Sequence, residues 1–569
     1  MGYNEGMQSK WWGWGDSKKR YPLEQSPNFW PFIEARLGSL PQQQHRPSPR
    51  EEIALPASRL HADDRTALQM ILGREGLSTE PNDRLTHAYG KSYRDLVRLR
   101  RGEVPHPPDA VVWPRSHEDA QRVIDLATAK CWAVIPFGGG TSVVGGVEVP
   151  AELSDRLFLS MDLAKLNQVL DVDVLSRTAK VEAGIMGPDL EAALQAQGVT
   201  LGHYPQSFEF STLGGWVATR SAGQQSTKYG KIEDMVIGLK MASPRGTLTV
   251  KALPARSTGP DLNGLILGSE GTLGVLTEVT VRVCPIPPQH DYRGVLFPSF
   301  EQGLETVRTL VQGGPTPATL RLSDVDETAA LMAMRAEPRS AWKRLVEGLA
   351  KRYLVRGPAV TSPERCLLIA GYEGGQAEVM AGWDRVRSVL AENEGLLLGR
   401  DPGRSWYRGR FELPYLRDTL LDRGIMVDTL ETCGSWSQLP ELYRLIRSAL
   451  QNALEREGGR GHVMCHLSHA YPDGASLYFT FMALQTEDTL AQWQAVKLAA
   501  TDAILAGGGA LSHHHAVGLD HAPFLPQELG ETGILALEGI KQALDPETCM
   551  NPGKLIRRIG PDAPEKGTI

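Results

Sequence analysis

The stretch AVIPFGGGTSVVGG, residues Ala133–Gly146, decides the fold. Ala133 to Ile135 has the apolar character of a buried strand, and Pro136 is expected to end its ladder because proline has no N–H to donate. Glycines 138–140 then allow positive φ and close approach to a ligand, and their N–H groups can converge on an anion. The stretch favours a loop that binds a dinucleotide pyrophosphate. The alternative is an ordinary glycine-rich turn, because one glycine loop alone is a weak signal.

Two later segments have the same mixture of glycines, small hydroxyl residues and apolar runs. They are Pro205–Gly230, PQSFEFSTLGGWVATRSAGQQSTKYG, and Gly268–Leu276, GSEGTLGVL. In order and spacing, the three segments resemble the FAD-binding domain of the vanillyl-alcohol-oxidase/PCMH superfamily and, more closely, the alkyldihydroxyacetonephosphate synthases. Matching segments extend from Lys10 to Pro552 and include KWWGWGD, STGPDLNGLILGSEGTLG, LRLSDVDE, LPYLRDTLLDRG, SHAYPDGASLYFTF and LSHHHAVG.

The composition indicates a soluble protein of two or three domains. The chain has 569 residues, of which 41% are apolar and 22% charged, and its net charge of −7 disfavours nucleic acid as a partner. Six cysteines without a CxxC pair favour a reducing compartment. We find no signal peptide, no membrane-spanning run and, in the final KGTI, no peroxisomal signal. We therefore expect a cytoplasmic protein, unlike the peroxisomal eukaryotic synthases.

The alternation of predicted strands and helices indicates an α+β fold. From Asp109 onward strands alternate with helices, including a helix over 117–129 capped by Ser116, and prolines near 285–288 mark a domain boundary. Four or more later strands alternate with helices, which suggests an α+β cap that holds the substrate. With the resemblance, we expect an N-terminal helical and aromatic extension (1–105), a PCMH-type FAD-binding domain (106–287), a cap domain of the FAD-linked oxidase C-terminal type (288–557) and a tail (558–569).

The first fifty residues are rich in aromatic side chains. Among glycines and prolines stand Trp11, Trp12, Trp14, Phe29, Trp30 and Phe32. A solvent-exposed arm would not carry so many aromatic residues, so we expect the arm to lie against the body of the protein. The alternative is a surface for a partner or a membrane.

The resemblance assigns three groups of residues to the flavin. The groups are the pyrophosphate loop Pro136, Phe137, Gly138, Gly139, Gly140, Thr141 and Ser142; then Gln206, Ser207, Phe208, Glu209, Phe210, Ser211, Thr212, Thr219, Arg220, Ser221 and Ala222 near the isoalloxazine and phosphates; and finally Glu270, Gly271, Thr272, Leu273, Gly274, Val275 and Leu276. In several relatives a histidine of the first loop bonds covalently to the flavin. Thr141 and Ser142 occupy that neighbourhood here, so we expect noncovalent, dissociable FAD. His203 is either a flavin neighbour or an ordinary loop histidine.

Three adjacent histidines, His513, His514 and His515, form a further candidate site. In an extended segment neighbours point to opposite faces, so all three cannot easily bind one metal, and we predict no metal site. They form either a solvent-exposed loop or, as the resemblance implies, active-site groups that face the flavin as base and hydrogen-bond donors. A histidine suits proton abstraction because its pKa lies near neutrality. The family usually has GVGK next, whereas this chain has Ala516 and Leu519, two departures that bear on substrate preference.

The resemblance also assigns roles to Tyr478, Arg417 and Arg321. Tyr478 lies in an alternating strand pattern, where a packed tyrosine is the ordinary expectation, but the match makes it the proton donor or acceptor. Arg417 matches the arginine that binds the substrate phosphate, for which a guanidinium fork is suited. The alternative is a surface arginine beside Asp418. We group Arg321, which matches a second arginine needed for activity, with the substrate-binding residues, and expect it to hold the flavin site together.

A second histidine group, His462, His466 and His469, has the spacing of metal ligands. FAD-dependent 2-hydroxy-acid dehydrogenases of the same superfamily carry a metal motif of the form HxGDGNxH in this region, and that motif is absent here. We therefore expect the three histidines to be structural or to support Tyr478, and a metal site is the alternative.

The resemblance implies a transferase that uses FAD without net redox. It would exchange the acyl chain of acylated dihydroxyacetone phosphate for a long-chain fatty alcohol. A histidine removes a proton next to the carbonyl, the flavin's central-ring nitrogen captures the carbon skeleton, the carboxylate leaves and the alcohol attacks. The alternatives are an FAD-linked oxidoreductase of a 2-hydroxy acid or alcohol, and a flavin-binding protein without activity. The family is dimeric, so we expect a homodimer, and peripheral membrane contact is a further expectation.

Overall fold

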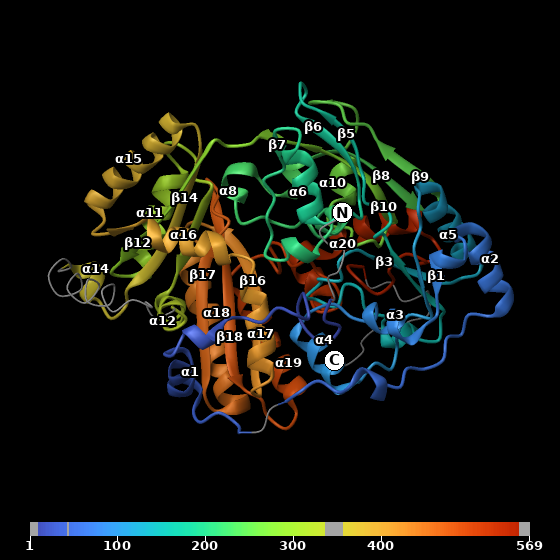
Figure 1. Cartoon of the computed structure of the whole chain (residues 1–569), viewed down its shortest axis with the longest axis horizontal. Helices are drawn as coiled ribbons and strands as arrows, with labels where there is room; N and C mark the ends of the chain where they lie inside the picture. Colours follow the sequence, from blue (N-terminus) through green and yellow to red (C-terminus); the bar gives the residue numbers. More distant parts are fainter. Residues whose placement is uncertain (1–8, 43–44, 336–356, 557–569) are drawn as a thin grey trace.

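The structure is a computed structural model that describes residues 9–42, 45–335 and 357–556. Figure 1 shows two bodies of secondary structure, with mixed sheets on the right and a long antiparallel sheet flanked by helices on the left. The predicted α+β class is confirmed. The predicted tail, 558–569, lies outside the described residues, and the limits of the predicted domains stay predictions.

The first sheet of the flavin side has the order β1-β2-β4-β3, and β4 pairs in parallel with both β2 and β3. Helix α5 (His117–Ala129) begins after the predicted N-cap Ser116, whose Oγ accepts from the Asp119 N–H. Strand β3 runs Ala133–Phe137, so it does not end before Pro136 as expected. The direction of the N–H groups explains the difference. The Val134 N–H points away from β4 and donates to Cys549 O at 2.8 Å. The nitrogen of Pro136, two residues further on, lies on that same side, so its missing N–H does not interrupt the pairing with β4. The other strands are β1 (Leu77–Ser78), β2 (Ala110–Val112) and β4 (Phe158–Asp162).

The second sheet of the flavin side is antiparallel, with the order β5-β6-β10-β8-β9. Its strands are β5 (Val169–Asp173), β6 (Thr178–Glu182), β10 (Val275–Arg282), β8 (Val236–Ser243) and β9 (Gly246–Val250). Strand β5 was not predicted from the sequence. Most of its residues are exposed, so its sequence lacks the alternation of apolar and polar residues that indicates a half-buried strand. A two-stranded pair, β7 (Val199–Thr200) and β11 (Cys284–Pro285), leads to the cap.

The cap is built on one seven-stranded antiparallel sheet with the order β15-β12-β14-β13-β17-β18-β16. The strands are β12 (Gln289–Phe297), β13 (Thr319–Ser323), β14 (Cys366–Gly374), β15 (Leu396–Gly399), β16 (Ile425–Ser435), β17 (Gly461–Ser468) and β18 (Gly474–Leu484). Helices α11 (Phe300–Val311), α15 (Gln376–Glu392), α18 (Leu439–Gly458) and α19 (Thr489–Ala506) pack with one face of this sheet in a common hydrophobic core.

Strand alternation decides which cap residues are left for a site. On β18 Leu477, Phe479 and Phe481 belong to the helix-covered core, so Tyr478 between them points to the other face. The same alternation on the neighbouring strands turns further polar side chains to that face. They are Arg321 on β13, Thr429 and Glu431 on β16, and His466 on β17.

The aromatic N-terminal arm packs on this second face, so the prediction that it lies against the body is confirmed. Helix α1 (Phe29–Leu37) shares a core with β16, β17, β18, α12 (Val325–Ala333) and α17 (Leu413–Leu421). Trp14 is 5% exposed and meets Phe210 of the flavin side edge to face. Lys10 Nζ reaches Asp418 Oδ2 of α17 at 2.8 Å, and both side chains are almost fully buried.

The remaining helices frame the two bodies. They are α2 (Ala62–Leu72), α3 (Pro81–Thr86), α4 (Tyr93–Arg101), α6 (Gly187–Gln195), α7 (Leu213–Thr219), α8 (Ser226–Tyr229), α9 (Ile232–Met235), α10 (Leu262–Ile266), α14 (Pro358–Thr361), α16 (Arg400–Gly409) and α20 (Leu525–Leu544). Among the helices of the described residues, none combines the length and the low charge that a bilayer-spanning segment requires.

The buried Lys10–Asp418 pair generates a stability prediction. Asp418→Ala leaves the buried Lys10 ammonium without its counter-charge and the Trp14 N–H without its acceptor, so the unfolding free energy should fall by about 3–5 kcal/mol. Denaturant unfolding measures the change, with Asp502→Ala, an exposed acid on α19, as the control. A loss as small as that of the control would mean that the pair does not hold the arm.

Candidate active site

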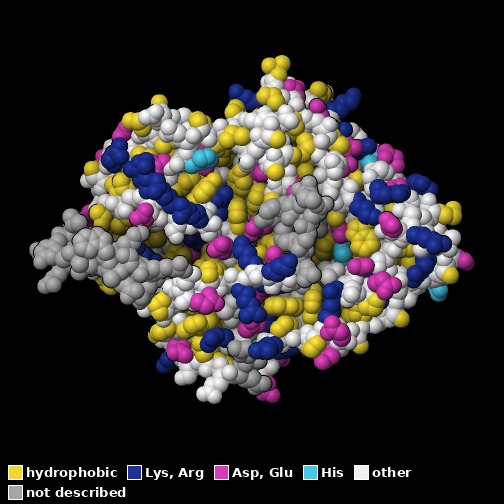
Figure 2. Space-filling model, viewed as in Figure 1, with side chains coloured by type: hydrophobic (Ala, Val, Ile, Leu, Met, Phe, Trp, Pro, Cys, Tyr) yellow, Lys and Arg dark blue, Asp and Glu magenta, His cyan; other side chains and the backbone are white. Residues whose placement is uncertain are grey.

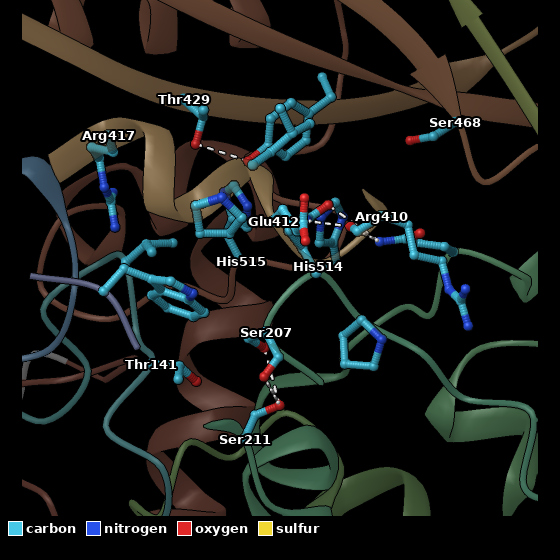
Figure 3. Close-up of a pocket in the computed structure, with 18 of the residues that line it drawn as sticks. Thr141, Ser207, Ser211, Arg410, Glu412, Arg417, Thr429, Ser468, His514 and His515 are labelled. Atoms are coloured by element: carbon cyan, nitrogen blue, oxygen red, sulfur yellow. Dashed lines mark hydrogen bonds between the residues drawn. The ribbon is translucent and has the colours of Figure 1, made fainter. Parts of the chain in front are cut away.

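A cavity of about 1660 Å³ lies between the flavin side and the cap. Figure 3 shows Thr141, Ser207 and Ser211 of the flavin side opposite Arg417 and Thr429 of the cap, with His514 and His515 between the two groups. The cavity is therefore lined by both bodies, and most of the residue groups predicted from the sequence meet in it.

Most predicted flavin residues lie on the cavity wall, and the rest lie behind it. The wall contains Pro136, Phe137, Gly138, Gly139, Gly140, Thr141, Ser142, Gln206, Ser207, Ser211, Thr212, Thr219, Ser221, Ala222, Glu270, Gly271, Gly274 and Leu276. Outside this wall are Phe208, Glu209, Phe210, Arg220, Thr272, Leu273 and Val275. Of these, Phe208 stacks on Trp216 and Phe210 supports Trp14. Their positions favour a supporting role over direct contact with a ligand.

The glycines of the first loop are required by close packing of two backbones. A Cβ on Gly139 would lie 1.7 Å from Phe210 O, and one on Gly138 would lie 2.3 Å from Thr212 Oγ1. The two predicted flavin loops thus touch, and their N–H groups and hydroxyls line one polar cradle that fits a dinucleotide. Thr141 and Ser142 lie on the wall where some relatives carry the covalent histidine. Noncovalent binding of FAD stays a prediction.

His203 lies just behind the flavin wall. It is fully buried, its Nε2 is 3.2 Å from Ser221 Oγ, and its ring packs against Trp216. Burial lowers the pKa of His203 to about 3. The ring is therefore neutral and contacts two residues of the cavity wall, Ser221 and Trp216.

The histidine loop is folded around one buried carboxylate, that of Glu431 on β16. Glu431 Oε1 accepts from Ser512 Oγ at 2.7 Å, His514 N at 3.0 Å and His515 N at 2.9 Å, and Oε2 accepts from His513 N at 2.7 Å. The segment is thus a turn and not the extended stretch assumed in the sequence analysis. Convergence of successive N–H groups on an anion explains the difference.

The turn separates the three histidines. His514 and His515 line the large cavity, whereas His513 lines only a smaller cavity of about 390 Å³, whose wall also includes His514. His513 Nε2 lies 3.1 Å from Tyr471 OH. Burial lowers the pKa of His514 and of His515, and the Glu431 charge opposes that effect. Two of the three histidines are thus neutral bases placed at the flavin side of the cavity.

Tyr478 lies among histidine rings on the cavity wall. Its ring stacks on His466, with centroids 4.9 Å apart, and on His514, at 6.0 Å, while His515 approaches edge on at 5.4 Å. The phenol donates to Thr429 Oγ1 at 3.0 Å, and burial raises its pKa to about 12. Tyr478 is therefore a protonated phenol within reach of groups that exchange protons.

The two predicted arginines differ in their partners. Arg321 binds Glu327 Oε1 at 2.9 Å and His466 Nδ1 at 3.0 Å. Although burial opposes it, the charges of Arg321 and His466 lower the pKa of Glu327 to about 2. Arg417 lines the cavity and makes no hydrogen bond or ion pair with any residue that the structure describes. The alternative of a surface arginine beside Asp418 does not hold, because Asp418 is bound to Lys10 and Trp14.

The second histidine group is dispersed. His462 packs against Phe32 of α1, His466 supports Tyr478, and His469 lies 2.8 Å from Ser226 Oγ through its Nδ1. One ligand atom from each of His469, His513 and His514 can be chosen so that all lie within 4.8 Å of one another. The sequence analysis did not pair His469 with the later histidines, because the two segments are far apart in the chain.

The sequence analysis missed Glu431 and assigned Glu270 only to the flavin. Glu270 accepts from Val517 N and Gly518 N, both at 2.8 Å, so it holds the other end of the histidine loop. Glu431 could have been recognised from the sequence, because it is an acid at an inward-facing position of the apolar stretch IMVDTLETCGS. A buried carboxylate in a strand needs hydrogen-bond donors, and here the histidine loop provides them.

Ala516 generates a prediction about this loop. Its φ is +72°, in the left-handed region, where the family usually has glycine. Ala516→Gly should raise the unfolding free energy by roughly 0.5–1 kcal/mol because it removes that strain. Ala510→Gly, at a residue without positive φ, is the control and should be destabilising. Equal destabilisation by both changes in denaturant unfolding would contradict the prediction.

Family comparisons agree with the two-domain arrangement. Residues 108–250 match the family described as FAD binding domain, and residues 286–555 match the FAD linked oxidases, C-terminal domain. A p-cresol methylhydroxylase structure is similar in fold, with a TM-score of 0.66 at 16% identity over 88% of this chain and 98% of that one. The predicted PCMH-type fold is thereby confirmed, and FAD is the cofactor.

Relatives of known name cover nearly the whole chain. Alkyldihydroxyacetonephosphate synthase of Dictyostelium discoideum is 36% identical over 97% of this chain and 94% of its own length. The enzyme of that name from Trypanosoma brucei brucei is 35% identical over 86% of this chain and 80% of its own. A solved alkyldihydroxyacetonephosphate synthase structure superposes with a TM-score of 0.83 at 33% identity, covering 96% of this chain and 98% of that one. The chain therefore belongs to the alkyldihydroxyacetonephosphate synthase family of FAD-dependent enzymes.

Proposed function

We propose that this enzyme exchanges the acyl chain of acylated dihydroxyacetone phosphate for a long-chain fatty alcohol, forming an ether without net redox. One observation carries the proposal: the guanidinium of Arg417, unpaired among the residues that the structure describes, shares a cavity with Tyr478, His514 and His515 beside the flavin loops. The names of the relatives support this choice of reaction.

The phosphate of the substrate would bind Arg417. A half-buried guanidinium that has no partner in the described part of the chain is suited to a phosphate dianion, which it can bind with two hydrogen bonds. Figure 3 shows Arg417 pointing into the space that His515 also faces. A phosphate held there would bring the adjoining ketone carbons to the histidines.

Proton transfer would be carried out by the chain's own residues. His514 and His515 are neutral and can remove a proton next to the carbonyl, and the Tyr478 phenol can donate a proton or return one. Bound FAD supplies an electron sink next to these groups. Thr429 and His466 hold the Tyr478 ring, and Arg321 with Glu327 hold His466.

The aliphatic chains would lie in the apolar part of the cavity. This wall is formed where α1, α17 and the cap sheet meet, by Phe29, Ile33, Leu420, Val427, Met464 and Met482. Burial of each methylene in such a wall stabilises binding by about 0.8 kcal/mol. An apolar wall beside a cationic one fits a phosphorylated lipid better than a short hydroxy acid.

Membrane contact, a homodimer and a cytoplasmic location are further parts of this proposal. The cavity wall includes exposed residues of α12, β15 and α16, namely Met332, Leu398, Arg404 and Arg408. Figure 2 shows a band of basic side chains across the upper left of the molecule, the region where Figure 1 places α15 and α16. Exposed apolar and basic groups at the mouth suit an anionic lipid surface that delivers both substrates.

A direct assay tests the proposed reaction. Purified enzyme incubated with palmitoyl-dihydroxyacetone phosphate and labelled hexadecanol should move label into an alkali-stable ether. The flavin spectrum should stay oxidised throughout, without oxygen. Bleaching of the flavin by a 2-hydroxy acid or an alcohol, with no ether formed, would support the oxidoreductase alternative instead.

Tyr478→Phe tests the proton-transfer assignment. The change keeps the ring stack on His466 but removes the phenolic proton, so turnover per bound FAD should fall by roughly 10²–10⁴. FAD content and melting temperature should hardly change, because the flavin loops lie in the other body. Tyr443→Phe is the matched control, since the Tyr443 hydroxyl binds Asp324 on the covered side of the same sheet. Wild-type turnover in Tyr478→Phe would remove this residue from the mechanism.

A further inference from the structure

We propose that Glu431 is the positioning residue of the active-site histidines: its carboxylate fixes the turn of the histidine loop and supplies the negative charge beneath His514 and His515. The inference rests on the proposed function only because ether formation is the activity that is assayed. The contacts that support it join strand β16 to the histidine loop.

The carboxylate of Glu431 is buried and accepts four hydrogen bonds from the loop. Its side chain is 0% exposed, and of the four donors from Ser512 to His515, three bind Oε1 and one, the His513 N–H, binds Oε2. The histidine rings stand further off, with His514 Nδ1 at 3.6 Å and His515 Nδ1 at 3.9 Å. The backbone is thus held by hydrogen bonds, while the rings feel the charge and stay free to meet a substrate.

An amide cannot replace this carboxylate. Glutamine has one acceptor oxygen, and its NH₂ group would face N–H groups that need an acceptor. Glu431→Gln therefore breaks the turn at one oxygen at least. Aspartate keeps the charge but is one methylene shorter, so Glu431→Asp restores the electrostatics in part and the geometry less well.

Several charged groups face the two rings, and Glu431 dominates among the anions. Burial lowers the pKa of His514 and of His515, and Glu431 is the strongest influence that raises both. The charge of Lys231 lowers the pKa of His514. The charges of Lys497 of α19 and Arg417 of α17 lower the pKa of His515. The neighbouring histidines also lower the pKa of His514, whereas Asp428 of β16 raises the pKa of His515. Loss of the Glu431 charge therefore lowers the pKa of both rings.

The chain provides a matched control in Glu191 of α6. It is 5% exposed and accepts from Leu201 N at 3.0 Å, Gly202 N at 3.2 Å and Thr200 Oγ1 at 2.8 Å. This is the same kind of buried, loop-holding carboxylate, away from the cavity wall. Glu191→Gln should lower stability and leave turnover per bound FAD and its pH dependence as in wild type.

The experiment compares wild type, Glu431→Gln, Glu431→Asp and Glu191→Gln as FAD-loaded enzymes. In Glu431→Gln, turnover per bound FAD should fall roughly 10²-fold, and the acid limb of the pH–rate profile, where the base becomes protonated, should move to lower pH. Glu431→Asp should recover the position of the acid limb more than the turnover. If Glu431→Gln matches Glu191→Gln in both measurements, the proposal is overturned.

A second readout does not depend on the reaction. The absorbance of bound FAD is titrated with pH without substrate, and a transition from the adjacent histidines should move to lower pH in Glu431→Gln. A shifted transition in an enzyme that forms no ether would refute the proposed function and keep the role of Glu431.

If Glu431→Gln does not fold, Ser512→Ala removes one of the four donors and should lower turnover about tenfold. Unchanged turnover and an unchanged flavin titration in Ser512→Ala would overturn the proposal.

Discussion

The turn of the histidine loop depends on two buried carboxylates from two different bodies of the protein. Glu431 of the cap accepts from residues 512–515, and Glu270 of the flavin side accepts from residues 517 and 518. The loop is thus held across the junction between the two bodies. Relative movement of the bodies would break hydrogen bonds to buried charge, which is costly, so the cavity is defined by the same contacts that hold the bodies together.

The two carboxylates differ in how well they are satisfied. Glu431 accepts four hydrogen bonds, and its pKa lies well below the usual range, although burial alone would raise it. Glu270 accepts two, and burial raises its pKa to about 7. The cap end of the loop is therefore fixed by a permanent charge. The flavin end is held by a group whose charge changes near neutral pH, and this group lines the cavity together with the other predicted flavin residues.

Local patterns in the sequence predicted the elements that need only local information. Ser116 predicted the start of α5 as its N-cap. The glycine loops predicted the flavin cradle. In contrast, the partners of Lys10 and of the histidine loop were out of reach, because Asp418 and Glu431 are distant in sequence. Pairing between distant residues depends on how strands are ordered in the sheet, which local periodicity does not specify.

Arg321 and Arg417 illustrate the same limit at the level of function. Both are arginines in segments that match the family, and the resemblance groups both with the substrate-binding residues, with Arg321 expected to hold the flavin site together. In the structure Arg321 is neutralised by Glu327 and joined to His466, so its charge is already used within the protein. Arg417 has no such partner among the described residues, and the adjacent acid Asp418 binds the N-terminal arm. Successive residues of a helix do not face each other, so the two side chains of α17 have separate roles: Asp418 holds the arm, and Arg417 lines the cavity, where it can bind an anionic substrate.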